Sequence, residues 1–124
     1  NSTWGNRTFP VYNPRDNVFA LGAAIGLGVA HGIGAAVAAP QRKVVCMCGD
    51  GGFFMGFADF WTATQERIDI VFLVMNDGGY GVIKHIQDTF HEGRHFFADF
   101  TNPTLEGCAK LAEMPYWKVE NTSN

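Results

Sequence analysis

The sequence has little net charge and few charged residues of either sign. Its 124 residues carry nine Lys and Arg against twelve Asp and Glu, which leaves a net charge of -3. This balance gives no electrostatic reason to expect binding to nucleic acid or to an anionic membrane. A disordered chain is excluded as well, because 47% of the residues are hydrophobic. The composition is therefore typical of a soluble globular domain with one core.

Cysteine is also scarce, with three residues in the chain. An odd number cannot form a complete disulfide framework, so we expect a reducing compartment and predict a cytoplasmic protein. Three Asn-x-Ser/Thr tripeptides would suit a secreted glycoprotein, but such short patterns are frequent by chance. Cys46 and Cys48 lie in an apolar run and are predicted to be buried, unreactive thiols.

One long apolar run, residues 18 to 39 (VFALGAAIGLGVAHGIGAAVAA), leaves two interpretations open. Its length would span a bilayer, and pairs of glycines four residues apart are typical of packed membrane helices. Ala and Gly dominate the run, however, and they contribute little transfer free energy. We therefore favour a closely packed, Gly-rich helix over residues 21–38, or a loop that leads into such a helix, ending before Pro40.

Two short apolar runs, Val44–Cys48 and Ile70–Met75, are typical of strands buried on both faces. Aromatic residues recur at helical spacing between them, which predicts a helix from about Phe54 to Arg67 with Trp61 in the core. Further expected elements are helices over residues 82–87 and 104–114, a loop over 88–103 and a strand over 116–119.

Strands that alternate with helices predict an α/β fold, with a parallel sheet covered by helices on both faces. Ligands of such sheets bind outside the carboxyl ends of the strands. Two turn-rich segments, Gly49–Gly52 and Asn76–Gly81, follow the predicted strands directly. We therefore expect the functional site at these two loops.

The first loop combines glycines with a carboxylate. Gly51 and Gly52 leave backbone N–H groups open to a bulky anion at the start of a helix, which suits a phosphate. Asp50 would repel a phosphate unless a cation lies between them, and this favours Mg²⁺ with oxygen ligands. The alternative is that Asp50 serves only as a helix N-cap.

The second loop offers what the first one lacks. Asp77 follows Asp50 by 27 residues, one strand–helix–strand unit later, so both can end at the same edge of the sheet. A carbonyl near Gly78 or Gly79 would be a further metal ligand. An ordinary Asp-Gly turn is the alternative. Together the two loops favour a metal–diphosphate site, and the spacing is neither that of a P-loop nor that of a dinucleotide-binding turn.

Residues 49 to 81, GDGGFFMGFADFWTATQERIDIVFLVMNDGGYG, resemble the thiamine diphosphate (ThDP) binding motif, which opens with Gly-Asp-Gly and closes with Asn-Asn or Asn-Asp. The resemblance continues upstream through LGAAIGLGVAHGIGAAVAAP and downstream to CAKLAEM and WKVEN. It is specific to the group of acetolactate synthase, pyruvate oxidase and benzoylformate decarboxylase. It implies that residues 1–124 are most of the C-terminal, diphosphate-binding domain of a larger multi-domain subunit, truncated at its C-terminal end.

The resemblance also implies roles for individual residues. Mg²⁺ would be bound by the side chains of Asp50 and Asp77 and by the carbonyl of Gly79. Asp77 stands where Asn is commoner, which adds a negative charge to the site. Ile25 would bend the cofactor into its V shape, and the Ala23 carbonyl would accept a hydrogen bond from the aminopyrimidine. The full set of implied cofactor-binding residues is Ala23, Ala24, Ile25, Gly49, Asp50, Gly51, Gly52, Asp77, Gly79, Tyr80 and Gly81.

The implied reaction cleaves or forms the C–C bond next to the carbonyl of a 2-oxo acid, as in the lyases and transferases of this group. We expect an acetolactate synthase-like enzyme, with a benzoylformate decarboxylase-like enzyme as the alternative. From the residues alone, a non-catalytic Mg²⁺ or nucleotide-binding module also stays open. The activating Glu would lie in the N-terminal pyrimidine-binding domain of a neighbouring subunit, in a homodimer or homotetramer. No catalytic residue is therefore assigned here, the chain alone is expected to be inactive, and FAD is compatible with another domain of the full-length protein.

Overall fold

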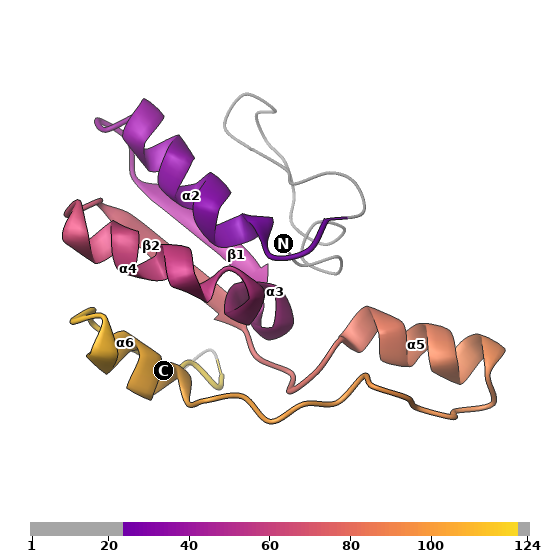
Figure 1. Ribbon diagram of the computed structural model, residues 1–124. Helices are drawn as coiled ribbons and strands as arrows, with labels where there is room; N and C mark the ends of the chain where they lie inside the picture. The colour runs from indigo at the N-terminus through magenta and orange to yellow at the C-terminus, as the bar shows by residue number, and fades with distance from the viewer. Residues whose placement is uncertain (1–23, 122–124) are drawn as a thin grey trace.

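The computed structural model describes residues 24–121, and its helices and strands alternate along the chain (Figure 1). This order confirms the predicted α/β class with a parallel sheet. The elements are α2 (Leu27–Ala38), β1 (Val44–Gly49), α3 (Asp50–Met55), α4 (Phe57–Gln65), β2 (Ile70–Met75), α5 (Gly81–Phe90) and α6 (Leu105–Leu111).

The two strands pair in parallel and end at the same level. Val44 lies opposite Ile70, and Gly49 lies opposite Met75 at the carboxyl ends of the strands. Since a parallel pair needs a crossover, α3 and α4 carry the chain back to the start of β2. The register therefore brings the loop after β2 beside the first turn of α3, where the sequence predicts a site.

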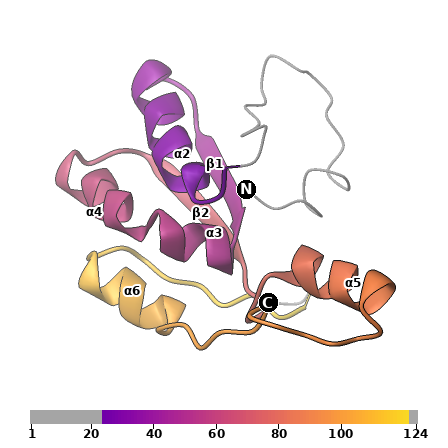
Figure 2. The same cartoon turned by 45° about the vertical axis from the view of Figure 1, so that its right-hand side comes forward.

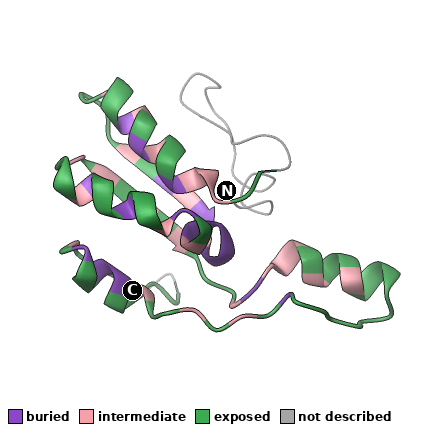
Figure 3. Cartoon of the chain, in the orientation of Figure 1, coloured by how far each residue is buried: buried purple, intermediate pink, exposed green. Residues whose placement is uncertain are grey.

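The core lies between the strands and the helices α2, α3 and α4 (Figure 3). Phe53 is 2% exposed and Val29 is fully buried, and both belong to one apolar cluster with the thiols of Cys46 and Cys48. The prediction of buried, free cysteines is confirmed. On the opposite face of the strands, within residues 24–121, the side chains of Val45, Val71, Leu73 and Met75 are exposed. The prediction that both strands are buried on both faces is therefore wrong for the described residues, because the helices that pack on the strands cover one face only.

Glycine in α2 allows the helix to lie close against β1. A Cβ atom at Gly32 would be only 2.8 Å from Cys46 Cβ, which is closer than side chains approach. The start of α2 is just as tight, because Gly26 has a φ of 90° and its carbonyl lies against Gly56. The Gly-rich helix is thus confirmed over Leu27–Ala38, whereas residues 24–26 lead into it without helical structure. No helix in the described part of the chain is long and apolar enough to cross a membrane.

Several predicted boundaries differ from the structure. The helix predicted from Phe54 to Arg67 is divided at Gly56 into α3 and α4, and α5 extends to Phe90 into the predicted loop. Trp61 is 49% exposed, so its assignment to the core is wrong; it follows Phe60 directly and therefore lies off the buried face of α4.

The predicted strand over residues 116–119 is also wrong, because this segment has no regular secondary structure. Tyr116, Trp117 and Val119 are exposed, and a strand needs a neighbour for its backbone hydrogen bonds. The helix expected within residues 104–114 is confirmed as α6, where Thr104 Oγ1 accepts a hydrogen bond from the Gly107 N–H at 3.1 Å.

Candidate cofactor and metal site

The two loops singled out from the sequence meet at the carboxyl ends of the strands. Asp50 is the first residue of α3, directly after β1, and the loop after β2 crosses in front of it. The backbone N–H of Gly78 donates a hydrogen bond to Asp50 Oδ2 at 3.0 Å. Residues from two successive loops are therefore in direct contact.

Asp50 is only 1% exposed, and among residues 24–121 it is the only charged residue that is buried. It is not the N-cap of α3: Gly49 holds that position, and no side chain caps the helix. Burial raises the pKa of the Asp50 carboxyl, and the carboxylate of Asp77 raises it further, whereas the N–H groups of Gly51 and Gly78 act in the opposite direction. A cation at this position would favour the ionised carboxylate.

Asp77 brings a second carboxylate to the same place, but it is exposed. Its Oδ2 lies against Gly81, the first residue of α5, where any Cβ atom would collide with it. Within residues 24–121, no group of three or more His, Cys, Asp or Glu side chains could hold a metal ion. Two carboxylates fit Mg²⁺ nevertheless, because this ion commonly takes one or two carboxylates together with phosphate oxygens and waters.

Gly79 is the point where a later segment of the chain approaches the loop. Gly79 and Asp99 form an antiparallel bridge, in which the Tyr80 N–H donates to the Ala98 carbonyl at 2.8 Å. The second bond of the bridge, 3.4 Å long, runs from the Phe100 N–H to the Gly78 carbonyl. Neither bond uses the carbonyl of Gly79, which the resemblance assigns to the metal.

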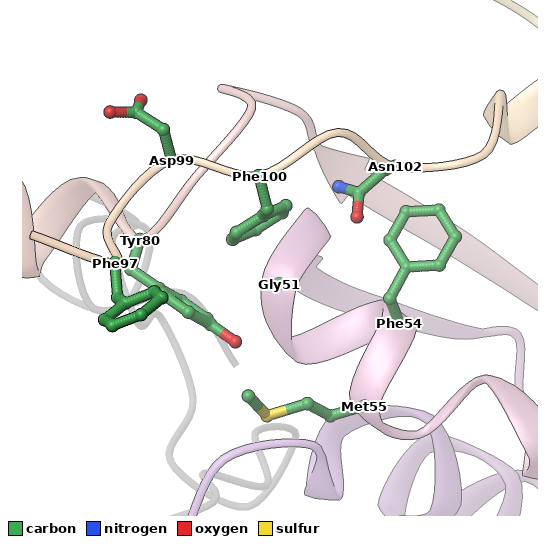
Figure 4. A pocket seen from close by; sticks show the side chains of 8 residues that line it. All are labelled: Gly51, Phe54, Met55, Tyr80, Phe97, Asp99, Phe100 and Asn102. Atoms are coloured by element: carbon green, nitrogen blue, oxygen red, sulfur yellow. The ribbon is translucent and has the colours of Figure 1, made fainter.

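The glycines at the start of α3 have a packing role of their own. A Cβ atom at Gly51 would lie 2.9 Å from Cδ1 of Tyr80, so this glycine accommodates the tyrosine ring. The Tyr80 ring in turn makes an edge contact with Phe100, at 4.9 Å between centroids. A pocket of about 370 Å³ opens beside them (Figure 4). It is lined by Gly51, Phe54, Met55, Tyr80, Phe97, Asp99, Phe100 and Asn102.

The described residues of the predicted upstream cofactor contacts, Ala24 and Ile25, do not lie beside Asp50. Ala24 and Ile25 are exposed and directly precede Gly26, which packs against Met55 and Gly56 at the far end of α3. Ala23 lies outside the described residues. The structure therefore brings together the loops of Asp50 and Asp77, whereas Ala24 and Ile25 precede a glycine that packs at the opposite end of α3.

Two residues near the carboxylates were missed by sequence reasoning. Lys84 forms an ion pair with Asp99 at 2.5 Å; Asp99 raises the pKa of the Lys84 ammonium, and Asp77 and Asp50 contribute in the same direction. Lys84 lies one turn after Gly81, where α5 begins, and this spacing could have predicted that its side chain lies near the loop of Asp77. Asn102 donates to Asp50 across 52 residues of sequence, and no local pattern indicates it.

Known proteins resemble much of this chain. The family described as "Thiamine pyrophosphate enzyme, C-terminal TPP binding domain" matches residues 1–124. The acetolactate synthase isozyme 1 large subunit of Escherichia coli (strain K12) is 33% identical over 78% of the chain and 17% of its own length. The acetolactate synthase large subunit of Haemophilus influenzae is 36% identical, over 85% of the chain and 18% of its own length.

Decarboxylases of the same group are also similar. Benzoylformate decarboxylase of Pseudomonas aeruginosa is 32% identical, over 57% of the chain and 13% of its own length. Among solved structures, the thiamine diphosphate-dependent 4-hydroxybenzoylformate decarboxylase of Rhodococcus jostii RHA1 matches with a TM-score of 0.66 and 27% identity, over 71% of the chain and 17% of its own. The chain thus spans less than a fifth of these relatives, and it belongs to the family of C-terminal TPP-binding domains of thiamine pyrophosphate enzymes.

Proposed function

We propose that this chain is the diphosphate- and Mg²⁺-binding part of a larger ThDP-dependent enzyme that cleaves or forms the C–C bond next to the carbonyl of a 2-oxo acid. An acetolactate synthase-like reaction is favoured by the names of the similar proteins. A decarboxylase of the benzoylformate type is the second candidate, supported by a sequence relative and a solved structure. The observation that carries the proposal is the buried Asp50 carboxylate, which faces the loop of Asp77.

In this proposal the chain's own residues bind the cofactor and orient it. The side chains of Asp50 and Asp77 and the carbonyl of Gly79 bind the metal ion, and the nearby backbone receives the diphosphate. ThDP, when bound, supplies a nucleophilic carbon and an electron sink for the substrate. In the proposal, the backbone of Gly51, Gly52, Tyr80 and Gly81 holds the diphosphate. The Ala23 carbonyl accepts a hydrogen bond from the aminopyrimidine, and Ile25 bends the cofactor into its V shape. Gly49 and Ala24 are proposed as further cofactor-binding residues.

The rest of the proposed enzyme lies outside this chain. We propose that the N-terminal pyrimidine-binding domain of a neighbouring subunit supplies the activating Glu, in a cytoplasmic homodimer or homotetramer. The chain by itself is then inactive, because half of the active site is absent from it. The exposed aromatic side chains of Phe96 and Phe97, whose rings are in contact, are consistent with contact to another domain.

The test is the thermal unfolding of the full-length protein with and without ThDP and Mg²⁺. A ligand present at 100 times its Kd stabilises the folded state by about 2.7 kcal/mol, so the melting temperature should rise. Asp50→Asn keeps the shape of the side chain but removes its charge, and it should abolish the shift.

Asp59→Asn is the matched control, because Asp59 is an exposed aspartate in the first turn of α4. This variant should keep the full stabilisation by ThDP and Mg²⁺. A wild-type protein that shows no shift would contradict the cofactor assignment. A full shift in Asp50→Asn would contradict the metal-binding role of Asp50, and nucleotide-induced shifts without any ThDP effect would favour a nucleotide-binding module.

A further inference from the structure

The segment Phe96–Asn102, called the strap below, lies against the loop that follows β2. Its Ala98 carbonyl accepts a hydrogen bond from the Tyr80 N–H, and its Asp99 pairs with Lys84. Asn102 stands at the end of the strap, and Figure 4 shows its side chain projecting toward the start of α3. Its Nδ2 donates a hydrogen bond to Asp50 Oδ2 at 3.2 Å.

The Asn102 amide completes the hydrogen bonding of a carboxylate oxygen that water hardly reaches. Oδ2 of Asp50 receives two donors, the Gly78 N–H and the Asn102 side chain, in a residue that is 1% exposed. Two donors on the same oxygen, one from the loop after β2 and one from the strap, restrict rotation of the carboxylate about its Cβ–Cγ bond. An amide achieves this without adding a positive charge that would compete with a cation.

We propose that Asn102 is a positioning residue, which orients the Asp50 carboxylate for Mg²⁺. The inference rests on the proposed function, because it needs Asp50 to be a metal ligand. Hydrogen-bond partners behind a ligating side chain typically change metal affinity by about 10- to 100-fold when they are removed. The strap is then part of the cofactor site, although it lies far from both glycine-rich loops in the sequence.

The strap holds Asn102 in place through contacts at its other residues. Asn102 itself is half-buried, and Phe100, two residues before it, packs its ring on Tyr80 at 4.9 Å. Ala98 is 1% exposed and anchors the bridge to the loop. The position of the amide is thus set by packing on the same loop that carries Asp77.

The experiment measures metal affinity of the full-length protein at saturating ThDP, by calorimetry or by tryptophan fluorescence. Asn102→Ala and Asn102→Leu should weaken Mg²⁺ binding by about 10- to 100-fold. Ca²⁺ tolerates irregular coordination better than Mg²⁺, so its affinity should fall less than that of Mg²⁺. Thr101→Ala changes the exposed neighbour of Asn102 and should leave both affinities unchanged.

The outcomes distinguish a failure of the proposed function from a failure of the positioning role of Asn102. If the wild-type protein does not bind ThDP with Mg²⁺ at all, the proposed function fails, and the role of Asn102 fails with it. If the wild type binds but both Asn102 variants match it, only the positioning role is overturned. Equal losses for Mg²⁺ and Ca²⁺, together with a lower melting temperature of the metal-free protein, would show a merely structural residue and also overturn it.

Discussion

Two parts of the molecule are held together in different ways, and the candidate site lies where they meet. The unit from α2 to β2, residues 27–75, forms most of a continuous apolar core, to which Ala112 after α6 also belongs. In contrast, α5 has no buried residue, and Figures 1 and 2 show it standing apart from the other helices. The first part therefore provides stability, whereas α5 and the strap can open at lower cost.

The second part of the molecule, α5 together with the strap, is held mostly by polar contacts. Lys84 pairs with Asp99, and the Gln87 side chain exchanges two hydrogen bonds with the backbone of Phe96, at 2.9 and 3.2 Å. Asp50 belongs to the packed unit, while Asn102 belongs to the strap. The proposed metal ligand Asp50 therefore lies on a rigid helix. The Asn102 amide that donates to it comes from the strap, which is held by fewer apolar contacts.

The largest expected effect is in the packed unit. Phe53→Ala should lower the free energy of unfolding by about 3–5 kcal/mol, because it leaves a cavity among packed side chains. Phe53 is 2% exposed, and its ring lies 5.2 Å from that of Phe60. Denaturant unfolding of the full-length protein measures the change.

Phe90→Ala is the counterpart in α5, where the side chain is 75% exposed. Its free energy of unfolding should stay within about 0.5 kcal/mol of the wild type. Comparable losses at Phe53 and Phe90 would remove the distinction between the two parts of the molecule.

A smaller change in the free energy of unfolding, of opposite sign, is expected for alanine substitutions at two glycines of α2. Gly32→Ala should destabilise the protein by about 1–3 kcal/mol, because the added methyl group would be forced against Cys46. Gly34 has no atom within 4 Å of a Cβ position, and Gly34→Ala should stabilise the helix by about 0.5–1 kcal/mol. Thermal or denaturant unfolding distinguishes them, and the same sign for both variants would contradict the close packing of α2 on β1.

The smallest effect is expected in the strap. Lys84→Gln removes the ion pair with Asp99 and should speed amide exchange around Tyr80, while exchange in β1 and the global unfolding midpoint stay unchanged. Hydrogen exchange followed by mass spectrometry measures both regions at once. Faster exchange throughout β1 would show that the strap is not a separate unit.

The same ion pair determines how the strap responds to pH. Lys84 lowers the pKa of the Asp99 carboxyl from its usual value of about 3.9. The stabilisation is therefore present above that usual value and is lost as the pH falls through the lowered pKa. The difference in exchange between wild type and Lys84→Gln should persist near neutral pH and disappear in stronger acid.

Local patterns were sufficient for much of the fold. Apolar runs identified both strands, and turn-forming residues after them indicated where the site should lie. The motif around Asp50 and Asp77 also identified the family correctly. The predictions of the strands and of the family succeeded because strand pattern and motif spacing depend on residues close together in the chain.

The failed predictions depend on contacts between distant residues. Residues 116–119 have an apolar strand pattern, yet they find no neighbouring strand in the described part of the chain. Trp61 has the composition of a core residue but lies off the buried face of α4, because Phe60 and Ala63 occupy that face. Apolar character alone does not say which side of an element will be covered.

By itself, the sequence determined the α/β class, the two loops and the pairing of an acidic residue with glycines in each. Only the tertiary structure decided that Asp50 would be buried and that its Oδ2 would receive the Gly78 N–H and the Asn102 amide. The reason is physical: burial and hydrogen bonding of a carboxylate depend on which segments fold over it. Asn102 is 52 residues away from Asp50, and packing of the strap on Tyr80 brings the two together.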